Sequence, residues 1–156
     1  EYAIISAAVT NRGVWAGLKL TNTSTIATDA DQAYFTYCSN DDFGTLSDNA
    51  HWHFVYSVGG TDYITDLGID NTTHDIYRLR ISIDSDRKVS IFVNDVQYGL
   101  THTGGSTGTT ESTATQKSLA LTNDVDLIPY VGLQTLTTSS SYLYLCYQKI
   151  SRILKE

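Results

Sequence analysis

Polar and apolar residues alternate over residues 76–94 more regularly than elsewhere in the chain. Positions 77, 79, 81 and 83 are apolar, the positions between them are polar, and the alternation restarts at Val89 after a polar break. Side chains two residues apart lie on the same face of a β-strand. The pattern therefore predicts a β-hairpin with one buried face. The side chains expected to be buried there are Leu79, Ile81, Val89, Ile91 and Val93.

The rest of the chain contains short alternating or apolar runs and no comparable stretch with a helical period. Ten strands are expected, near Ala3–Val9, Val14–Leu20, Ala33–Cys38, Trp52–Val58, Tyr63–Ile69, Ile76–Ile83, Val89–Asn94, Leu119–Leu121, Ile128–Leu136 and Tyr142–Ile150. Glycine, asparagine and aspartate, which favour turns, separate these runs. Many short strands without helices predict an all-β antiparallel sandwich or barrel.

The length of 156 residues is that of one domain, expected over residues 1–156. Residues 101–118 contain three glycines and almost no apolar side chain, so we expect a flexible surface loop there, or an arm that becomes ordered on a partner. The chain does not begin with methionine, which is typical of a processed or excised piece.

The chain has a formal net charge of −7. Proteins bind nucleic acids largely through clustered lysine and arginine, so the charge argues against a nucleic-acid partner. It disfavours anionic membranes for the same reason, and no apolar run approaches the ~18 residues that a membrane span needs.

The closing segment 142–147 has apolar or aromatic residues at every position. Leu143 and Leu145 fall on one face of the expected strand, and Tyr142, Tyr144 and Cys146 on the other. Both faces are therefore expected to be at least partly buried, as near the centre of a sheet that is covered by a second layer or a subunit.

Two cysteines, Cys38 and Cys146, lie far apart in expected strands. They can form one bridge or remain two buried thiols. Free thiols are favoured, because a secreted domain stabilised by disulfides usually contains more cysteines.

The order of these pieces resembles the concanavalin A-like jelly roll of lectins, laminin-G-type modules and some glucanases. The resemblance rests on the hairpin YRLRISID…KVSIFVND, the long loop, LIPYVGLQT and the aromatic strand that ends in ISRIL. Within this superfamily the chain looks most like modules of tailed-bacteriophage virion proteins, which tend to carry GLKLTNT…DADQAYFTY, a central tryptophan strand and LIPYVGLQT. The resemblance covers about residues 14–154 and implies the fold more than a function.

Glucanases of this fold use two glutamates on one strand, because retaining hydrolysis needs a nucleophile and an acid/base ~5 Å apart. This chain has only Glu1, Glu111 and Glu156. Aspartates occur at turns such as Asp84-Ser85-Asp86, where carboxylates favour local backbone hydrogen bonds. We therefore expect no catalytic residues and no enzymatic activity.

Metal-binding candidates are few. His51 and His53 have the spacing of a metal-binding pair, but solvent-facing histidines are favoured because a third ligand is not evident. Trp52 and Phe54 are expected to point into the core.

Calcium is more plausible than zinc, since acidic loops supply oxygen ligands, although no ligand-spacing motif is present. The acidic groups are Asp29 with Asp31, then Asn40 with Asp41 and Asp42, and Asp62 with Asp66.

Aromatic rings can stack on sugars, and four side chains are the candidate ligand-binding set: Trp15, Tyr34, Tyr63 and Tyr98. Trp15 is the best of them, because Val14, Ala16 and Leu18 are expected to take the buried face and leave Trp15 on the other one.

The first functional hypothesis is a non-enzymatic virion structural module, a capsid decoration or a fibre or appendage domain, in a particle assembled in the host cytoplasm. Its partners would be other virion proteins and further copies of itself, with Tyr142, Tyr144 and Tyr130 at the subunit interface. The resemblance implies a trimer. The alternative is a lectin-like domain that binds a surface glycan.

Overall fold

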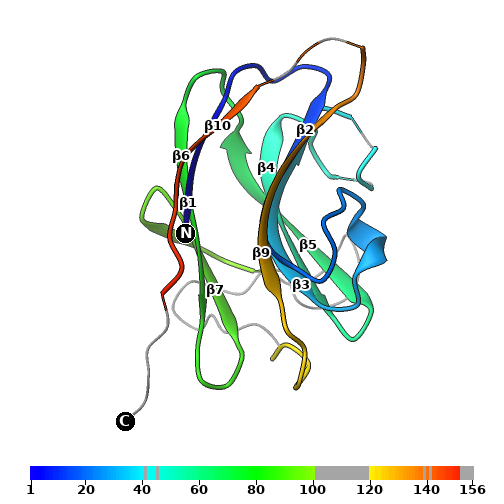
Figure 1. The fold of residues 1–156 in the computed structure, drawn as a ribbon, viewed down its shortest axis with the longest axis vertical. Helices are drawn as coiled ribbons and strands as arrows, with labels where there is room; N and C mark the ends of the chain where they lie inside the picture. The colour runs from blue at the N-terminus through cyan, green and yellow to red at the C-terminus, as the bar shows by residue number, and fades with distance from the viewer. Residues whose placement is uncertain (41, 45, 101–119, 139, 141, 152–156) are drawn as a thin grey trace.

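The protein folds as a sandwich of two antiparallel β-sheets, each with five strands (Figure 1). The computed structural model describes residues 1–156 except 41, 45, 101–119, 139, 141 and 152–156. The loop expected at 101–118 therefore lies outside the described residues. No helix in the described part of the chain has the length and apolar content needed to cross a bilayer.

The strands follow two spatial orders. Sheet A contains β10 (Leu143–Gln148), β1 (Tyr2–Ser6), β6 (Ile76–Ile83), β7 (Val89–Val93) and β8 (Val96–Tyr98). Sheet B contains β5 (Thr61–Asp70), β4 (His51–Val58), β3 (Gln32–Cys38), β2 (Arg12–Lys19) and β9 (Ile128–Thr135). One short 3-10 helix, η1 (Ile26–Thr28), lies on the side of sheet B that faces away from sheet A (Figure 1).

The main core fills the space between the sheets, as the alternation in β6 and β7 predicts. Leu79 pairs with Val93 and Ile81 with Ile91 across these two strands. Four of the five side chains expected to be buried have 2% exposure or less, but Ile81 is only partly buried against the core. Trp52 and Phe54 of β4 are fully buried in the same cluster, as predicted.

A second apolar cluster lies on the outer face of sheet B. Trp15 of β2, Tyr34 of β3 and Val55 of β4 point away from sheet A there. They are covered by Phe43 and Leu46 from the β3–β4 connection, and by Ile26 of η1. The three central strands of sheet B, β2, β3 and β4, are therefore buried on both faces.

Two tight turns set the register of neighbouring strands. β4 and β5 are joined through Gly59 and Gly60, with φ of 56° and 84°. β7 and β8 are joined through Asn94 and Asp95, with φ of 50° and 68°. Positive φ at both central residues is the requirement of the two-residue hairpin turn, and these residue types tolerate it best.

The placement of the closing strand differs from the prediction. β10 is an edge strand that pairs only with β1 among the described strands, and five of its six residues are exposed. Apolar residues on both faces predicted a central strand. An apolar pattern indicates that side chains favour burial. It does not indicate whether they are buried by the same chain or by another one.

One smaller prediction was also wrong, and one strand was missed. Ala120 and Leu121 are not in a strand: Leu121 is buried and makes one backbone hydrogen bond to the Arg87 carbonyl, without a ladder. β8 was not predicted, because three residues are too few to show an alternation.

Candidate functional site

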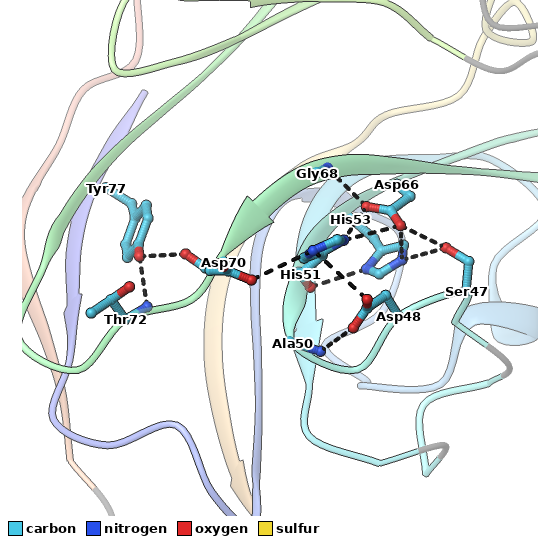
Figure 2. Close-up of polar contacts among 10 residues, drawn as sticks. All are labelled: Ser47, Asp48, Ala50, His51, His53, Asp66, Gly68, Asp70, Thr72 and Tyr77. Atoms are coloured by element: carbon cyan, nitrogen blue, oxygen red, sulfur yellow. Dashed lines mark hydrogen bonds and ion pairs between the residues drawn. The ribbon is translucent and has the colours of Figure 1, made fainter.

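The polar cluster around His51 and His53 is built by the β4–β5 hairpin. His53 lies opposite Asp66 in the register, and a bulge between the two histidines places His51 opposite Asp70. Ser47, from the loop before β4, reaches the same cluster (Figure 2). The prediction that both histidines face solvent is wrong, because His53 is fully buried.

His53 lies in a hydrogen-bond chain whose direction depends on its protonation. Its Nδ1 is 3.1 Å from the His51 carbonyl oxygen, which can only accept, so Nδ1 carries a proton. Its Nε2 is 3.1 Å from Ser47 Oγ, which is 3.0 Å from Asp66 Oδ2. The serine has one proton, which it donates either to Nε2 of a neutral imidazole or to Asp66, whereas an imidazolium donates to the hydroxyl through Nε2 and leaves the serine proton for Asp66.

The surroundings of His53 and Asp66 shift their pKa values. Burial lowers the pKa of His53, and the charge of Asp66 opposes that shift only in part. Burial alone would raise the pKa of Asp66, but hydrogen bonds from Gly68 N and Ser47 and the nearby His53 lower it overall. Near neutral pH the cluster therefore holds a neutral His53 next to an ionised Asp66.

His51 is the more exposed histidine of the pair. Its Nδ1 is 2.9 Å from Asp66 Oδ1, and its Nε2 lies 3.7 Å from Asp48 Oδ2 and 3.5 Å from Asp70 Oδ1 (Figure 2). Within the described ranges, no three His, Cys, Asp or Glu side chains converge to hold a metal ion.

The cluster also differs from a hydrolytic triad. Ser47 and His53 have the atoms of a nucleophile and a base, but a triad carboxylate would orient the imidazole through Nδ1. Here Nδ1 bonds a backbone carbonyl, and Asp66 bonds the serine instead. The arrangement can store or release a proton and it ties the loop at Ser47 to the hairpin.

Two of the acidic residues proposed for calcium, Asp29 and Asp31, accept hydrogen bonds from backbone N–H groups of the protein itself. Asp29 accepts hydrogen bonds from the backbone N–H groups of Leu20 and Thr21, each at 3.0 Å. Asp31 accepts one from Thr122 N at 2.9 Å. Asp41 is not described. At the turn after β6, Asp84 accepts from the N–H groups of Asp86 and Lys88, as predicted for turn carboxylates.

Two of the four rings proposed for ligand binding are covered. Trp15 is 8% exposed and Tyr34 is fully buried, both in the cluster on the outer face of sheet B. Trp15 does point away from the main core, as predicted, but its ring packs edge-on against Phe43 and its Nε1 donates to Asn22 Oδ1. It presents no free face for a sugar.

The other two rings lie elsewhere. Tyr63 and Tyr98 are partly buried and pack against the main core between the sheets. The structure therefore does not bring the four candidate rings together on one surface.

The largest group of exposed apolar side chains belongs to the β10 region. Of the nine large hydrophobic side chains that are exposed among the described residues, five lie within residues 142–150. We call them the β10 surface, and they are Tyr142 at 64%, Tyr144 at 55%, Leu145 at 46%, Tyr147 at 39% and Ile150 at 72% exposure. Tyr142 and Tyr144, two of the predicted interface residues, belong to it.

Tyr130, the third predicted interface residue, lies on the other sheet. It pairs with Gly17 of β2, on the outer face of sheet B, and is partly buried. Tyr144 pairs with Ile5 of β1, on the outer face of sheet A. The predicted interface residues therefore occupy two opposite faces of the sandwich.

The link between the histidines and Asp66 was missed, although the sequence contained a signal for it. A two-residue turn at Gly59 and Gly60 pairs residues whose numbers sum to 119, which places His53 opposite Asp66, as found. The contribution of Ser47 was not predictable in this way, because it comes from a loop.

Both cysteines are free, as predicted, but only Cys38 is buried. The expectation of two buried thiols is wrong for Cys146, which is exposed on the edge strand β10. Glu111, Glu156 and His102 lie outside the described residues.

In the comparisons with known proteins, no family model matches the chain, and no curated protein or solved structure matches it significantly.

Proposed function

We propose that the chain is a non-enzymatic structural module that works by assembling with further copies of itself. The single observation that carries this proposal is the concentration of exposed apolar side chains on the β10 surface. Aromatic residues with a polar end are enriched at subunit interfaces, and three of the five residues are tyrosines. Exposed apolar side chains that gather along one segment of a chain are typical of an interaction site.

The setting in a virion and the concanavalin A-like jelly-roll topology are parts of the same proposal. They rest on the sequence resemblance over residues 14–154, with which two antiparallel five-stranded sheets are compatible. The partners would then be other virion proteins, and neither nucleic acid nor membrane. The glycan-binding alternative is less well supported, because Trp15 and Tyr34 are buried.

Light scattering over a concentration series tests the proposal. The wild-type chain should have a mass that is a multiple of 17.2 kDa at high micromolar concentration. Replacing Tyr142 and Tyr144 with serine should shift the equilibrium to the monomer. The matched control replaces two equally exposed apolar residues on other edges, Val96 and Ile128, and should leave the mass unchanged.

A wild-type chain that stays monomeric at high micromolar concentration would overturn the proposal. A glycan array on the same sample distinguishes self-assembly from glycan binding. A monomer that binds one class of glycan would favour the lectin-like function.

A further inference from the structure

The described strands leave four sheet edges, at β10, β8, β5 and β9, which differ in how they are protected. An edge strand presents unpaired backbone N–H and C=O groups, and natural edges carry charges, proline, bulges or short strands that prevent pairing with another chain. β8 has three residues. β5 carries three aspartates and Gly68 at a φ of 62°, and β9 has Pro129 at its second position.

β10 lacks most of these protections. Its six residues, Leu143–Gln148, include no charged residue, no proline and no glycine. Its one irregularity is a bulge at Cys146, because Leu145 pairs with Ile4 while Tyr147 pairs with Ala3. The segment before the bulge pairs regularly with β1 and has an open edge among the described strands.

Exposed side chains flank this open edge on both sides of the sheet. Tyr144 lies on the outer face, next to Ile5 and Ile76 in the cross-strand row. Leu145 lies on the other face, in the row of Ile4 and Tyr77. A strand added beside β10 would therefore contact apolar side chains above and below the sheet.

The charge distribution indicates which strand would be added. The chain has a net charge of −7, so two copies repel each other over most of their surfaces. β10 itself is uncharged, and the carboxylate of Glu1 at its end lies near the cations Arg80 and Lys149. β10 is thus an edge at which two copies can meet without like charges facing each other.

We propose that β10 pairs antiparallel with β10 of a second copy, which joins the two A sheets into one continuous sheet across a two-fold axis. An antiparallel pair of identical strands is isologous, so each residue contacts its partner reciprocally and the contact closes after two copies. This inference rests on the proposed self-assembly. It replaces the three-fold symmetry that the resemblance implied with a two-fold contact between two copies.

Cys146 provides a direct test because it is the exposed cysteine, whereas Cys38 is buried. At a rise of ~3.3 Å per residue, an antiparallel pair centred anywhere within β10 brings the two Cys146 Cα atoms within about 20 Å of each other. A bismaleimide that spans this distance should cross-link the oligomeric wild type into dimers. The control is a Cys146→Ser chain with Val96→Cys on β8, the other edge of the same sheet, which should not cross-link.

Two further variants separate pairing from folding. Tyr144→Lys places a charge on each of the two facing edges and should abolish the cross-link while the diluted monomer unfolds at the wild-type temperature. Ile128→Lys on β9 should leave the cross-link intact. An oligomer that does not cross-link through Cys146 would overturn the β10 pair and leave self-assembly standing, whereas a monomer at every concentration would overturn both.

Discussion

Both sheets carry some apolar side chains on their outer faces, but these side chains are covered differently. On sheet B, Trp15 and Tyr34 lie beneath Phe43 and the residues around it. On sheet A, Tyr144 and Ile76 are 55% and 56% exposed, and no described segment is packed on them. Connections of the same chain thus cover the outer face of sheet B, whereas these side chains of sheet A, at and near the edge where we propose that a second copy binds, are left exposed by the described residues.

An apolar outer face can be covered in two physically different ways. A cover from the same chain is always present, so it contributes to the stability of the monomer. A cover from a second copy contributes only at concentrations where the copies associate, because its stabilisation follows mass action. Substitutions on the two faces should therefore differ in what they change.

The largest effect is expected at Phe43, which covers sheet B. Phe43 is fully buried and packs on Trp15 with ring centroids 5.7 Å apart. Phe43→Ala should lower the free energy of unfolding by about 3–5 kcal/mol, the range for a buried phenylalanine. Urea unfolding of the dilute protein measures this. Tyr144→Ala on sheet A should stay within about 0.5 kcal/mol of the wild type under the same conditions. Equal losses at the two positions would contradict the comparison.

A smaller effect is expected at Gly132 of β9, over which the Trp15 ring lies. A Cβ atom at Gly132 would lie 2.0 Å from Trp15 Cζ2, so the ring must move. Gly132→Ala should cost about 1–3 kcal/mol, as overpacking does. A double-mutant cycle with Trp15→Ala gives the check: the cost of the alanine at 132 should fall once the ring is absent. An unchanged cost would show that the ring is not the cause.

The pH dependence of stability should distinguish the β4–β5 hairpin from sheet A. Because burial lowers the pKa of His53, the unfolded chain takes up a proton near its ordinary pKa of ~6.5 before the folded chain does. The free energy of unfolding should therefore fall as the pH decreases from 6.5 towards the folded pKa. A second fall, from Asp66, should begin below its ordinary pKa of 3.8.

His53→Asn isolates the histidine contribution, because the asparagine amide can still donate to the His51 carbonyl. This variant should lose the first fall and keep the second. His74→Asn, at an exposed histidine with a φ of 69°, is the matched control and should retain both. If the free energy of unfolding of His53→Asn still falls below pH 6.5, that fall comes from another group.

The smallest effect is expected for the monomer when the β10 surface is made polar. Tyr147→Ser removes a 39% exposed ring that donates to the Glu1 carboxylate at the surface. Exposed hydrogen bonds of this kind contribute little, so the unfolding midpoint in dilute solution should hardly change. A clear loss of monomer stability would show that the β10 surface already serves the isolated chain.

Much of the fold was predictable because alternation and turn chemistry are local signals. The boundaries of β6 were predicted without error, and strands were predicted on both sides of the glycine pair at 59 and 60, where β4 and β5 lie. Which strand lies at an edge depends on contacts between distant segments, and for this reason β10 was misplaced. The burial of Trp15 was also missed. Trp15 is covered by residues 43 and 46, and no spacing in the sequence predicts that contact.

Hydrogen exchange at two protein concentrations tests the central claim most directly. β10 has backbone N–H groups that β1 does not use, whereas β3 lies in the centre of sheet B and is the internal reference. Raising the concentration from low to high micromolar should slow exchange in peptides that cover β10, leave β3 unchanged, and have no effect on β10 in Tyr144→Lys. Exchange in β10 that is independent of concentration, or slowing confined to another edge, would contradict the account.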